Sequence, residues 1–156
     1  MKKLLIIRHA KATDEGPDGD FARPLKKSGK DDAQRLAVTL KDNDLIPQII
    51  YTSPALRAKT TADIIGKLND ISLGNPIDSV YEASDSTLLS VINNFPDEFD
   101  FIALTGHNPG LSIISTYLSL EYHSLPTCGA VLIIFEFDDW ALISAATGKV
   151  EWVYEP

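Results

Sequence analysis

The chain has 156 residues, a net charge of −8 at pH 7 and 44% apolar residues, which are ordinary values for a globular protein. Its length fits one domain, so we expect a single domain over residues 1–156. The negative charge argues against nucleic acid and anionic membrane surfaces as partners, because both require a basic face.

Cysteine and histidine are both rare in the sequence. There is one cysteine, Cys128, and the three histidines are far apart in the chain. A single cysteine excludes an intramolecular disulfide framework and a cysteine-rich zinc site, and we expect no metal. The apolar run at residues 4–7 is too short for a signal peptide, and no window approaches the ~18 apolar residues of a membrane span. These features predict a cytoplasmic protein.

The first half of the chain is predicted to alternate strands with helices. Residues 3–8 (KLLIIR) form a continuous apolar run, which is typical of a buried strand. A polar loop over residues 11–27 follows, after which Ser28 is expected to cap a helix. Residues 48–51 (QIIY) predict a second strand. Ser53 and the proline after it then fit the cap and first position of a second helix.

The second half continues this alternation. Residues 76–81 predict a third strand, and Asp85 or Ser86 is expected to cap the helix that follows. Residues 100–105 (DFIALT) predict a buried fourth strand. Asn108 and the proline after it again fit a helix start.

The last part of the chain is predicted to form only strands. They are expected at residues 129–137, 141–145 and 150–154, as a meander at one edge of a sheet. Together with the preceding alternation, this order predicts an α/β fold. We expect three layers, α/β/α, with helices on both faces of a mainly parallel central sheet.

Side chains that could perform chemistry follow the predicted strands. Arg8 and His9 end the first strand, Arg57 lies in the first turn after the second, Glu82 follows the third and His107 follows the fourth. Ligands of open α/β sheets bind at the carboxyl ends of the strands. We therefore expect these five side chains to meet at one edge of the sheet.

Each of these residue types suits phosphoryl transfer. Arginine presents a planar set of donors that matches phosphate oxygens and keeps its charge. A neutral imidazole nitrogen can attack phosphorus and form a covalent phosphohistidine. A second imidazole, when protonated, adds a donor and a positive charge. A carboxylic acid can protonate the leaving oxygen and then activate water. Side chains alone can thus balance the phosphate charge, so we expect no cofactor.

Three motifs resemble those of the histidine phosphatase superfamily, in the same order along the chain. Residues 7–10 (IRHA) resemble its Arg-His-Gly signature, and residues 53–62 (SPALRAKTTA) are similar to its Ser-Pro-x-x-Arg-Ala-x-x-Thr-Ala segment. Residues 106–110 (GHNPG) resemble its second-histidine motif. The short length, these last five residues and the alanine at position 10 most resemble the SixA-like phosphohistidine phosphatases. The alanine departs from the commonest signature, and it disfavours any positive φ that glycine would allow.

The resemblance implies a phosphoglycerate-mutase-like fold and a role for each matched residue. It implies that His9 is the nucleophile and that Arg8, Arg57 and His107 hold the phosphoryl group. Asn108, beside His107, is a further candidate for substrate binding.

The identity of the proton donor is open at this stage. The resemblance places it near Glu82, which also fits a solvated loop carboxylate. Asp14, Glu15 and Asp20 in the first loop are rival acids. A phosphoramidate substrate needs less help from such an acid, because its P–N bond is labile once protonated.

Three functions compete. The first is hydrolysis of phosphohistidine on a protein, favoured because a chain this short has no room for a large insertion over the pocket. The second is a small-molecule phosphomonoester phosphatase or phosphomutase with the same core. The third is a non-catalytic phosphate-binding module, which the presence of His9 disfavours. The expected partner is a phosphorylated protein or a small phosphorylated molecule, and the sequence predicts no particular oligomeric state.

Overall fold

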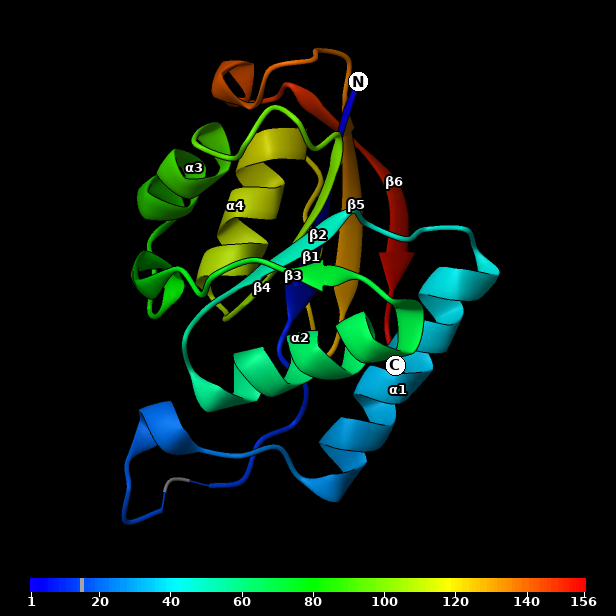
Figure 1. Cartoon of the computed structure of the whole chain (residues 1–156). Helices are drawn as coiled ribbons and strands as arrows, with labels where there is room; N and C mark the ends of the chain where they lie inside the picture. The colour runs from blue at the N-terminus through cyan, green and yellow to red at the C-terminus, as the bar shows by residue number, and fades with distance from the viewer. Residues whose placement is uncertain (15) are drawn as a thin grey trace.

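A computed structural model describes residues 1–14 and 16–156 (Figure 1). The rival acid Glu15 lies outside the described residues. The strands are β1 (Lys2–Arg8), β2 (Ile49–Thr52), β3 (Ser72–Leu73), β4 (Phe101–Gly106), β5 (Ala130–Phe135) and β6 (Gly148–Tyr154). The helices are α1 (Lys27–Asp42), α2 (Leu56–Asn69), α3 (Asp85–Asn93) and α4 (Gly110–Ser119). Short 3₁₀ helices cover Asp20–Ala22, Asp78–Val80 and Trp140–Leu142.

The strands of the described residues form one six-stranded sheet in the order β3-β2-β4-β1-β5-β6. The pairs β3-β2, β2-β4 and β4-β1 are parallel, whereas β5 runs antiparallel to both β1 and β6. The sheet is therefore mixed, with β5 as its one reversed strand. This arrangement confirms the predicted α/β class and the mainly parallel sheet.

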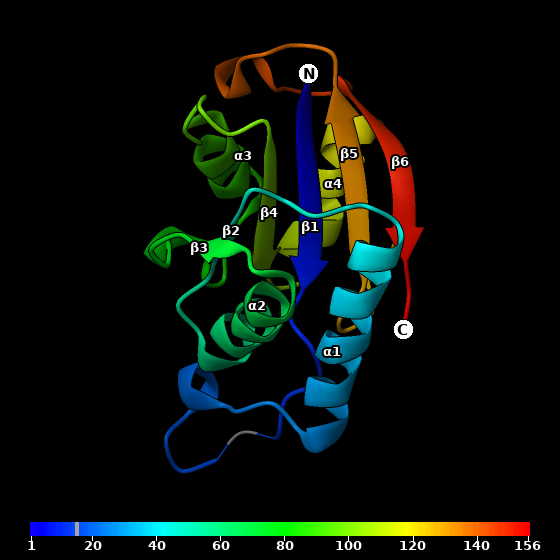
Figure 2. The ribbon, with the colours of Figure 1, turned by 45° about the vertical axis from the view of Figure 1, so that its right-hand side comes forward.

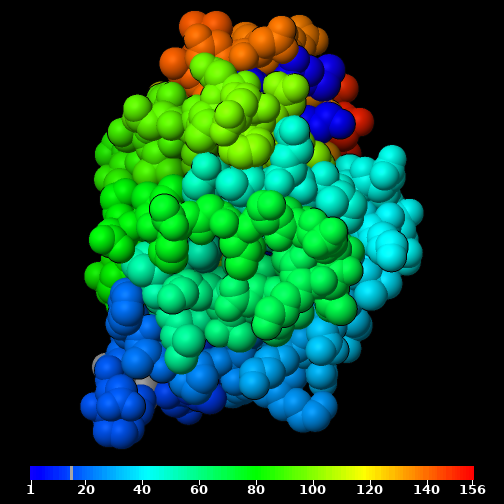
Figure 3. Space-filling view, viewed as in Figure 1, coloured from blue at the N-terminus to red at the C-terminus, as the bar shows by residue number. Residues whose placement is uncertain are grey.

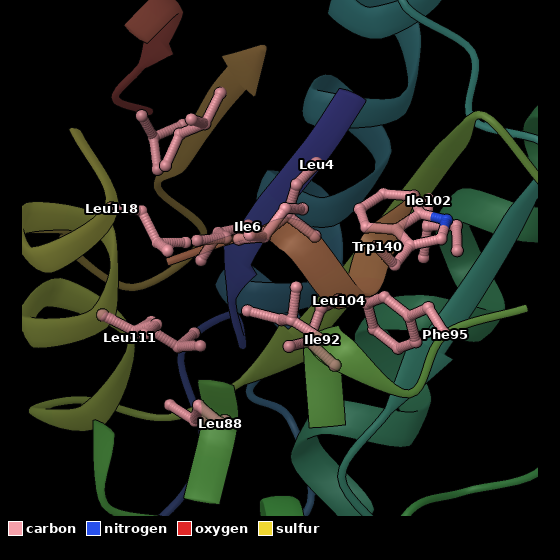
Figure 4. Packing of buried hydrophobic residues seen from close by; sticks show 14 of the residues in the cluster. Leu4, Ile6, Leu88, Ile92, Phe95, Ile102, Leu104, Leu111, Leu118 and Trp140 are labelled. Carbon is pink, nitrogen blue, oxygen red and sulfur yellow. The ribbon is translucent and has the colours of Figure 1, made fainter. Parts of the chain in front are cut away.

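Helices cover both faces of the sheet, as expected. Figures 1 and 2 show α3 and α4 on one face and α1 and α2 on the other. Successive residues of a strand point to opposite faces, so β1 supplies Leu4 and Ile6 to one core and Leu5 and Ile7 to the other. In Figure 4, Trp140 and the strand side chains pack in the core on the α3 and α4 face. A strand buried on both faces explains the unbroken apolar run of β1.

Two predicted strands are wrong. Residues 76–81 contain a 3₁₀ helix over Asp78–Val80 instead of a strand, and the edge strand is β3, which comes earlier. Only the N–H of Ile77 bonds back to β2, at the carbonyl of Thr52, before the chain turns away. Proline at position 76 removes one of the donors that a strand would need.

The second wrong strand is residues 141–145, where a 3₁₀ helix covers Trp140–Leu142. Trp140 and Ile143 are buried, and both of their carbonyl oxygens accept hydrogen bonds from the side-chain amide of Asn93 (2.8 and 2.9 Å). A side chain of α3 thus satisfies the backbone groups that a neighbouring strand would otherwise pair.

The predicted helix caps also differ from those observed. Ser28 lies inside α1, and Ser53 lies two residues before the cap position of α2. Ser84, rather than Asp85 or Ser86, accepts the capping hydrogen bond of α3. Among the described residues, no helix is long and apolar enough to cross a membrane.

A close approach at the start of α1 yields a prediction. Gly29 packs against the backbone just after β1, where an added Cβ would lie 2.2 Å from the carbonyl oxygen of Lys11. Gly29→Ala should therefore lower the free energy of unfolding by about 2 kcal/mol, because backbone must shift to make room. Urea denaturation measures this loss. Lys30→Ala changes an exposed neighbour in the same turn and should stay near wild type. A Gly29→Ala variant as stable as wild type would contradict the close packing.

Candidate active site

The carboxyl ends of β1, β2 and β4 meet at one edge of the sheet. The first loop protrudes at this end of the molecule, at the lower left of Figure 3. The N–H of His9 follows β1 and donates to the carbonyl of Gly106 at the end of β4 (3.0 Å). The N–H of Ser53 follows β2 and donates to Thr105 of β4 (3.0 Å). Backbone pairing thus continues past the ends of the strands and holds the segments that carry the polar side chains.

The ring of His9 has a defined tautomer. Its Nδ1 lies 2.8 Å from the carbonyl oxygen of Ala10, and because a carbonyl can only accept, Nδ1 carries the proton. Nε2 then presents a lone pair, toward which Nε of Arg57 donates at 3.3 Å. Burial, with smaller contributions from the positive charges of Arg57 and Arg8, lowers the pKa of His9 to about 4. The ring is therefore neutral at pH 7, and its electron pair is at Nε2, where it accepts the hydrogen bond from Arg57.

Position 10 does not need glycine. Ala10 is absent from the residues with positive φ, so its methyl group causes no backbone strain. Its N–H donates to the hydroxyl of Thr61 (3.0 Å), which in turn donates to the carbonyl of Arg57 (2.8 Å). The segment after β1 is thereby tied to α2 through two residues of the predicted motif.

His107 lies beside His9, with ring centroids 5.2 Å apart. Its Nε2 is 2.7 Å from the hydroxyl oxygen of Ser53. Burial, with the positive charge of Arg57 as the next cause, lowers the pKa of His107 to about 3. Within the described part of the chain, no group pairs with its buried Nδ1. His107 is thus a second neutral imidazole here rather than an imidazolium.

Arg8 and Asn108 converge on one backbone oxygen. Nη1 of Arg8 and Nδ2 of Asn108 both donate to the carbonyl of Leu125, at 3.0 and 2.9 Å. Oδ1 of Asn108 accepts from the N–H and the hydroxyl of Ser112 in α4. Nε of Arg8 is buried and finds no acceptor among residues 1–14 and 16–156. Arg8 therefore keeps a donor for a group that is not part of the protein.

Asp20 anchors the first loop to the site. Its carboxylate accepts from Arg57 (3.1 Å), from Arg23 (3.0 Å) and from the hydroxyl of Tyr81 (2.6 Å), and its carbonyl accepts from Arg57 (2.8 Å). The hydrogen bonds from Tyr81 and Arg23 hold the pKa of this carboxyl well below its usual range. The same contact raises the pKa of Tyr81 to about 12. Asp20 is consequently a carboxylate that orients Arg57, and it has no proton to give as a rival acid.

The converging side chains enclose a polar pocket of about 310 Å³. The four predicted phosphoryl-contacting residues and Asn108 all line it. Its complete lining is Arg8, His9, Lys11, Ala12, Arg23, Lys26, Arg57, His107, Asn108 and Thr127. Cationic side chains dominate this lining, so the pocket suits an anion.

Glu82 does not line this pocket. It is exposed and lies in an adjoining hollow of about 460 Å³, which shares Arg57, His107 and Asn108 with the pocket. Asp14 is exposed and lines neither hollow. The structure thus brings together Arg8, His9, Arg57, His107 and Asn108, and it leaves Glu82 one hollow away.

Sequence reasoning did not assign several contributors. The sequence predicts Ser53 to be a helix cap and Tyr81 to be a strand residue, and it gives no catalytic or binding role to Arg23. The sequence signal for a role of Ser53 is its place as the first residue of the second motif, residues 53–62. No sequence signal connects Tyr81 to Asp20, because their contact depends on how the loop folds back. The described residues contain no group of three or more His, Cys, Asp or Glu side chains placed to hold a metal ion.

Comparison with known proteins finds a family and solved structures that the chain resembles. The model of the histidine phosphatase superfamily (branch 1) matches residues 4–76. The structure of SixA from Agrobacterium tumefaciens is 25% identical, with a TM-score of 0.84 over 99% of this chain and 98% of that one. Residues 4–76 are therefore similar to the histidine phosphatase superfamily, and the whole chain is SixA-like in structure. These similarities support a phosphatase, a hydrolase, as its enzyme class.

Two further relatives agree with this assignment. A structure of the protein histidine phosphatase SixA complexed with tungstate is 19% identical, with a TM-score of 0.78 over 97% of this chain and 95% of that one. An uncharacterized chloroplastic protein of Arabidopsis thaliana is 28% identical over 99% of this chain and 76% of its own length. The solved structures confirm the predicted phosphoglycerate-mutase-like fold.

The buried imidazole of His9 predicts a dependence of stability on pH. The folded protein holds its pKa at about 4, below the ordinary value of 6.5. Between these pH values the His9 ring is protonated in the unfolded chain and neutral in the folded chain. The stabilisation is therefore fully present above pH 6.5 and lost as the pH falls. From this group alone, we expect a loss of about 2 kcal/mol of unfolding free energy on acidification to about pH 4.5.

Urea denaturation in phosphate-free buffer measures this slope. His9→Asn should remove the contribution of His9 and make the dependence on pH shallower over this window, while the contribution of His107, whose pKa is also lowered, remains. His123→Asn is the matched control, since His123 pairs with Glu121 outside the site and should keep the wild-type slope. Equal slopes in wild type and His9→Asn would show that His9 is not held neutral by the fold.

Proposed function

We propose that this phosphatase hydrolyses phosphohistidine on proteins, through a covalent phosphoryl group on Nε2 of His9. One observation carries the proposal. The carbonyl of Ala10 fixes the proton on Nδ1, so that Nε2 carries a lone pair into a cationic pocket. A neutral imidazole with a fixed tautomer is a competent nucleophile at neutral pH.

Arg8, Arg57, His107 and Asn108 would bind the phosphoryl oxygens. Buried donors without acceptors cost about 1–3 kcal/mol each, and Nε of Arg8 is such a donor among the described residues. A phosphoryl oxygen would satisfy it. His107 would offer the hydrogen of one ring nitrogen in the same way. The negative charge of the phosphoryl group would also oppose the arginine charges that lower the pKa values of both histidines.

The chemistry proceeds in two displacements. In the first, the lone pair of Nε2 forms a bond to phosphorus, and the P–N bond of the substrate breaks, with its electron pair going to the leaving nitrogen. In the second, water attacks phosphorus and the bond to Nε2 breaks, returning the lone pair to His9. The product is dihydrogen phosphate, which keeps both protons of the water until bulk solvent removes one. Nδ1 holds its proton on the carbonyl of Ala10 throughout.

The substrate class rests on the size and composition of the site. At about 310 Å³ the pocket is at the small end of ligand pockets, and its lining is polar and cationic, so it suits the phosphoryl group and offers little apolar surface to the rest of the substrate. This favours a phosphoryl group carried on the surface of a protein. A phosphomonoester would require a proton for its leaving oxygen, with Glu82 as the candidate donor, whereas phosphohistidine requires none from the enzyme.

Two broader predictions accompany this proposal. We retain a single histidine phosphatase domain over residues 1–156. The Arabidopsis relative is described as chloroplastic, and the cytoplasmic location stays a prediction for this chain.

The first test is turnover of a protein that has been phosphorylated on histidine with phosphoramidate, with p-nitrophenyl phosphate as the monoester comparison. We expect phosphohistidine to be preferred in kcat/KM. His9→Ala should lower kcat/KM by a factor on the order of 10³ or more, because the attacking nitrogen is lost. His123→Ala is the control and should retain wild-type rates. Preference for the monoester would keep the chemistry but reject the phosphohistidine substrate.

The covalent intermediate has its own test. Brief mixing with the phosphorylated protein, followed by alkaline quench and mass spectrometry, should place a phosphoryl group on His9. Phosphohistidine survives alkali, whereas a phosphoryl group on a carboxylate does not. His107→Ala retains the nucleophile and should still accumulate label on His9. Turnover by wild type without any such label would reject the two-step route.

A further inference from the structure

The hollow beside the phosphoryl pocket has no role in the proposal so far. The two share Arg57, His107 and Asn108, but His9 lines only the phosphoryl pocket. The hollow also contains Asp20, Glu82 and the backbone segments before α3 and α4. It is therefore continuous with the phosphoryl site on the side of the shared residues and is separate from the nucleophile.

This position fits the path of a leaving group. In phosphoryl transfer the attacking and leaving atoms lie roughly in line through phosphorus. When Nε2 of His9 attacks from its own pocket, the leaving atom departs on the opposite side. A phosphoryl group held by Arg57, His107 and Asn108 would thus release its leaving group toward the hollow.

The two cavities differ in charge. The phosphoryl pocket is lined by Lys11, Arg23 and Lys26 in addition to its two other arginines. The hollow has Arg57 as its one permanent cation, together with the carboxylates of Asp20 and Glu82. When a phosphoryl group pairs with Arg57, the charged side chains that remain in the lining of the hollow are the carboxylates of Asp20 and Glu82.

Glu82 is the freer of the two carboxylates. Asp20 is paired with Arg23 and Arg57, whereas Glu82 has no ion pair within the described residues. Its φ of 54° places it in the left-handed region, which is uncommon for a residue with a side chain. Unusual backbone conformations concentrate at functional sites, where the surrounding structure holds them in place.

We propose that this hollow is the leaving-group subsite and that Asp20 and Glu82 select leaving groups that carry positive charge, namely a protonated imidazole ring. This inference rests on the proposed function and specifies its substrate chemistry. A phosphorylated imidazole accepts a proton on its free ring nitrogen and becomes a cation. When the P–N bond breaks, the bonding pair returns to the leaving nitrogen, and a neutral imidazole departs with the proton on its other nitrogen. The two carboxylates stabilise the cationic ring and donate no proton.

The test compares two substrates in matched variants. Phosphohistidine has a ring that carries positive charge. p-Nitrophenyl phosphate releases a stabilised phenolate anion, so it needs no proton from Glu82, unlike an ordinary phosphomonoester. Glu82→Gln keeps the size of the side chain and removes its charge, and Glu82 makes no ion pair with Arg57. Asp20→Asn likewise keeps the size of the side chain and removes its charge, at a position that pairs with Arg57. Asp18→Asn is the control, since Asp18 is an exposed acid of the same loop and lines neither cavity.

We expect the two substrates to respond in opposite directions. In Glu82→Gln, kcat/KM for phosphohistidine should fall and that for p-nitrophenyl phosphate should hold or rise. The ratio of the two should drop by about fivefold, and by about tenfold or more in the Glu82→Gln, Asp20→Asn double variant. Asp18→Asn should leave the ratio unchanged.

The possible failures are distinguishable. If wild type hydrolyses phosphohistidine through His9 but the ratio is unchanged in both variants, the subsite is wrong and the proposed function stands. An equal fall for both substrates would make the carboxylates supports for Arg57 and would also reject charge selection. If wild type does not hydrolyse phosphohistidine, the proposed function itself fails.

Discussion

The hydrogen bond from Nδ1 of His9 to the carbonyl of Ala10 is the constraint on which this site depends. It decides which ring nitrogen carries the proton, and therefore which one faces the pocket with a lone pair. The backbone that provides the carbonyl is itself held on two sides. The N–H of Ala10 is bonded to Thr61 of α2, and the carbonyl of His9 accepts from the N–H of Cys128 before β5. The position of the proton on the His9 ring is thus set by backbone geometry after β1.

The pocket is lined by cationic side chains, although the chain as a whole is acidic. A chain with a net charge of −8 gathers three arginines and two lysines around one pocket of about 310 Å³. This concentration has a cost for the histidines, since the arginine charges add to burial in lowering their pKa values. It also explains why a carboxylate lies within the site. Asp20 relieves part of the repulsion between Arg23 and Arg57 while it holds Arg57 beside His9.

The sequence was sufficient for the central strands of the sheet and for the histidines and arginines at its carboxyl edge. Long apolar runs identify β1 and β4 because both strands are buried on both faces. Adjacent polar residues then mark His9 and His107. The two wrong strands have a different origin, since residues 76–81 and 141–145 are short and their buried residues, Val80 and Ile143, do not pair in the sheet.

Contacts between distant segments were beyond a sequence-based prediction. A serine before a proline has the pattern of a helix cap, and only the tertiary fold makes Ser53 a partner of His107. The position of Glu82 relative to the pocket likewise depends on a backbone turn that its residue type disfavours. The three sequence motifs indicate which residues belong to the site. The distances between these residues depend on how the loops pack.

The central place of β1 has a consequence for the synthesis of the protein. This strand and His9 are synthesised before both of the strand's neighbours in the sheet, residues 101–106 and 130–135. The carbonyl of Leu125 that receives Arg8 also comes late. The proposed phosphoryl site is therefore incomplete in a nascent chain until residues 125–135 have been synthesised. Until then, both edges of a strongly apolar strand are open to pairing with other chains, which makes early release from the ribosome the moment of greatest risk of aggregation.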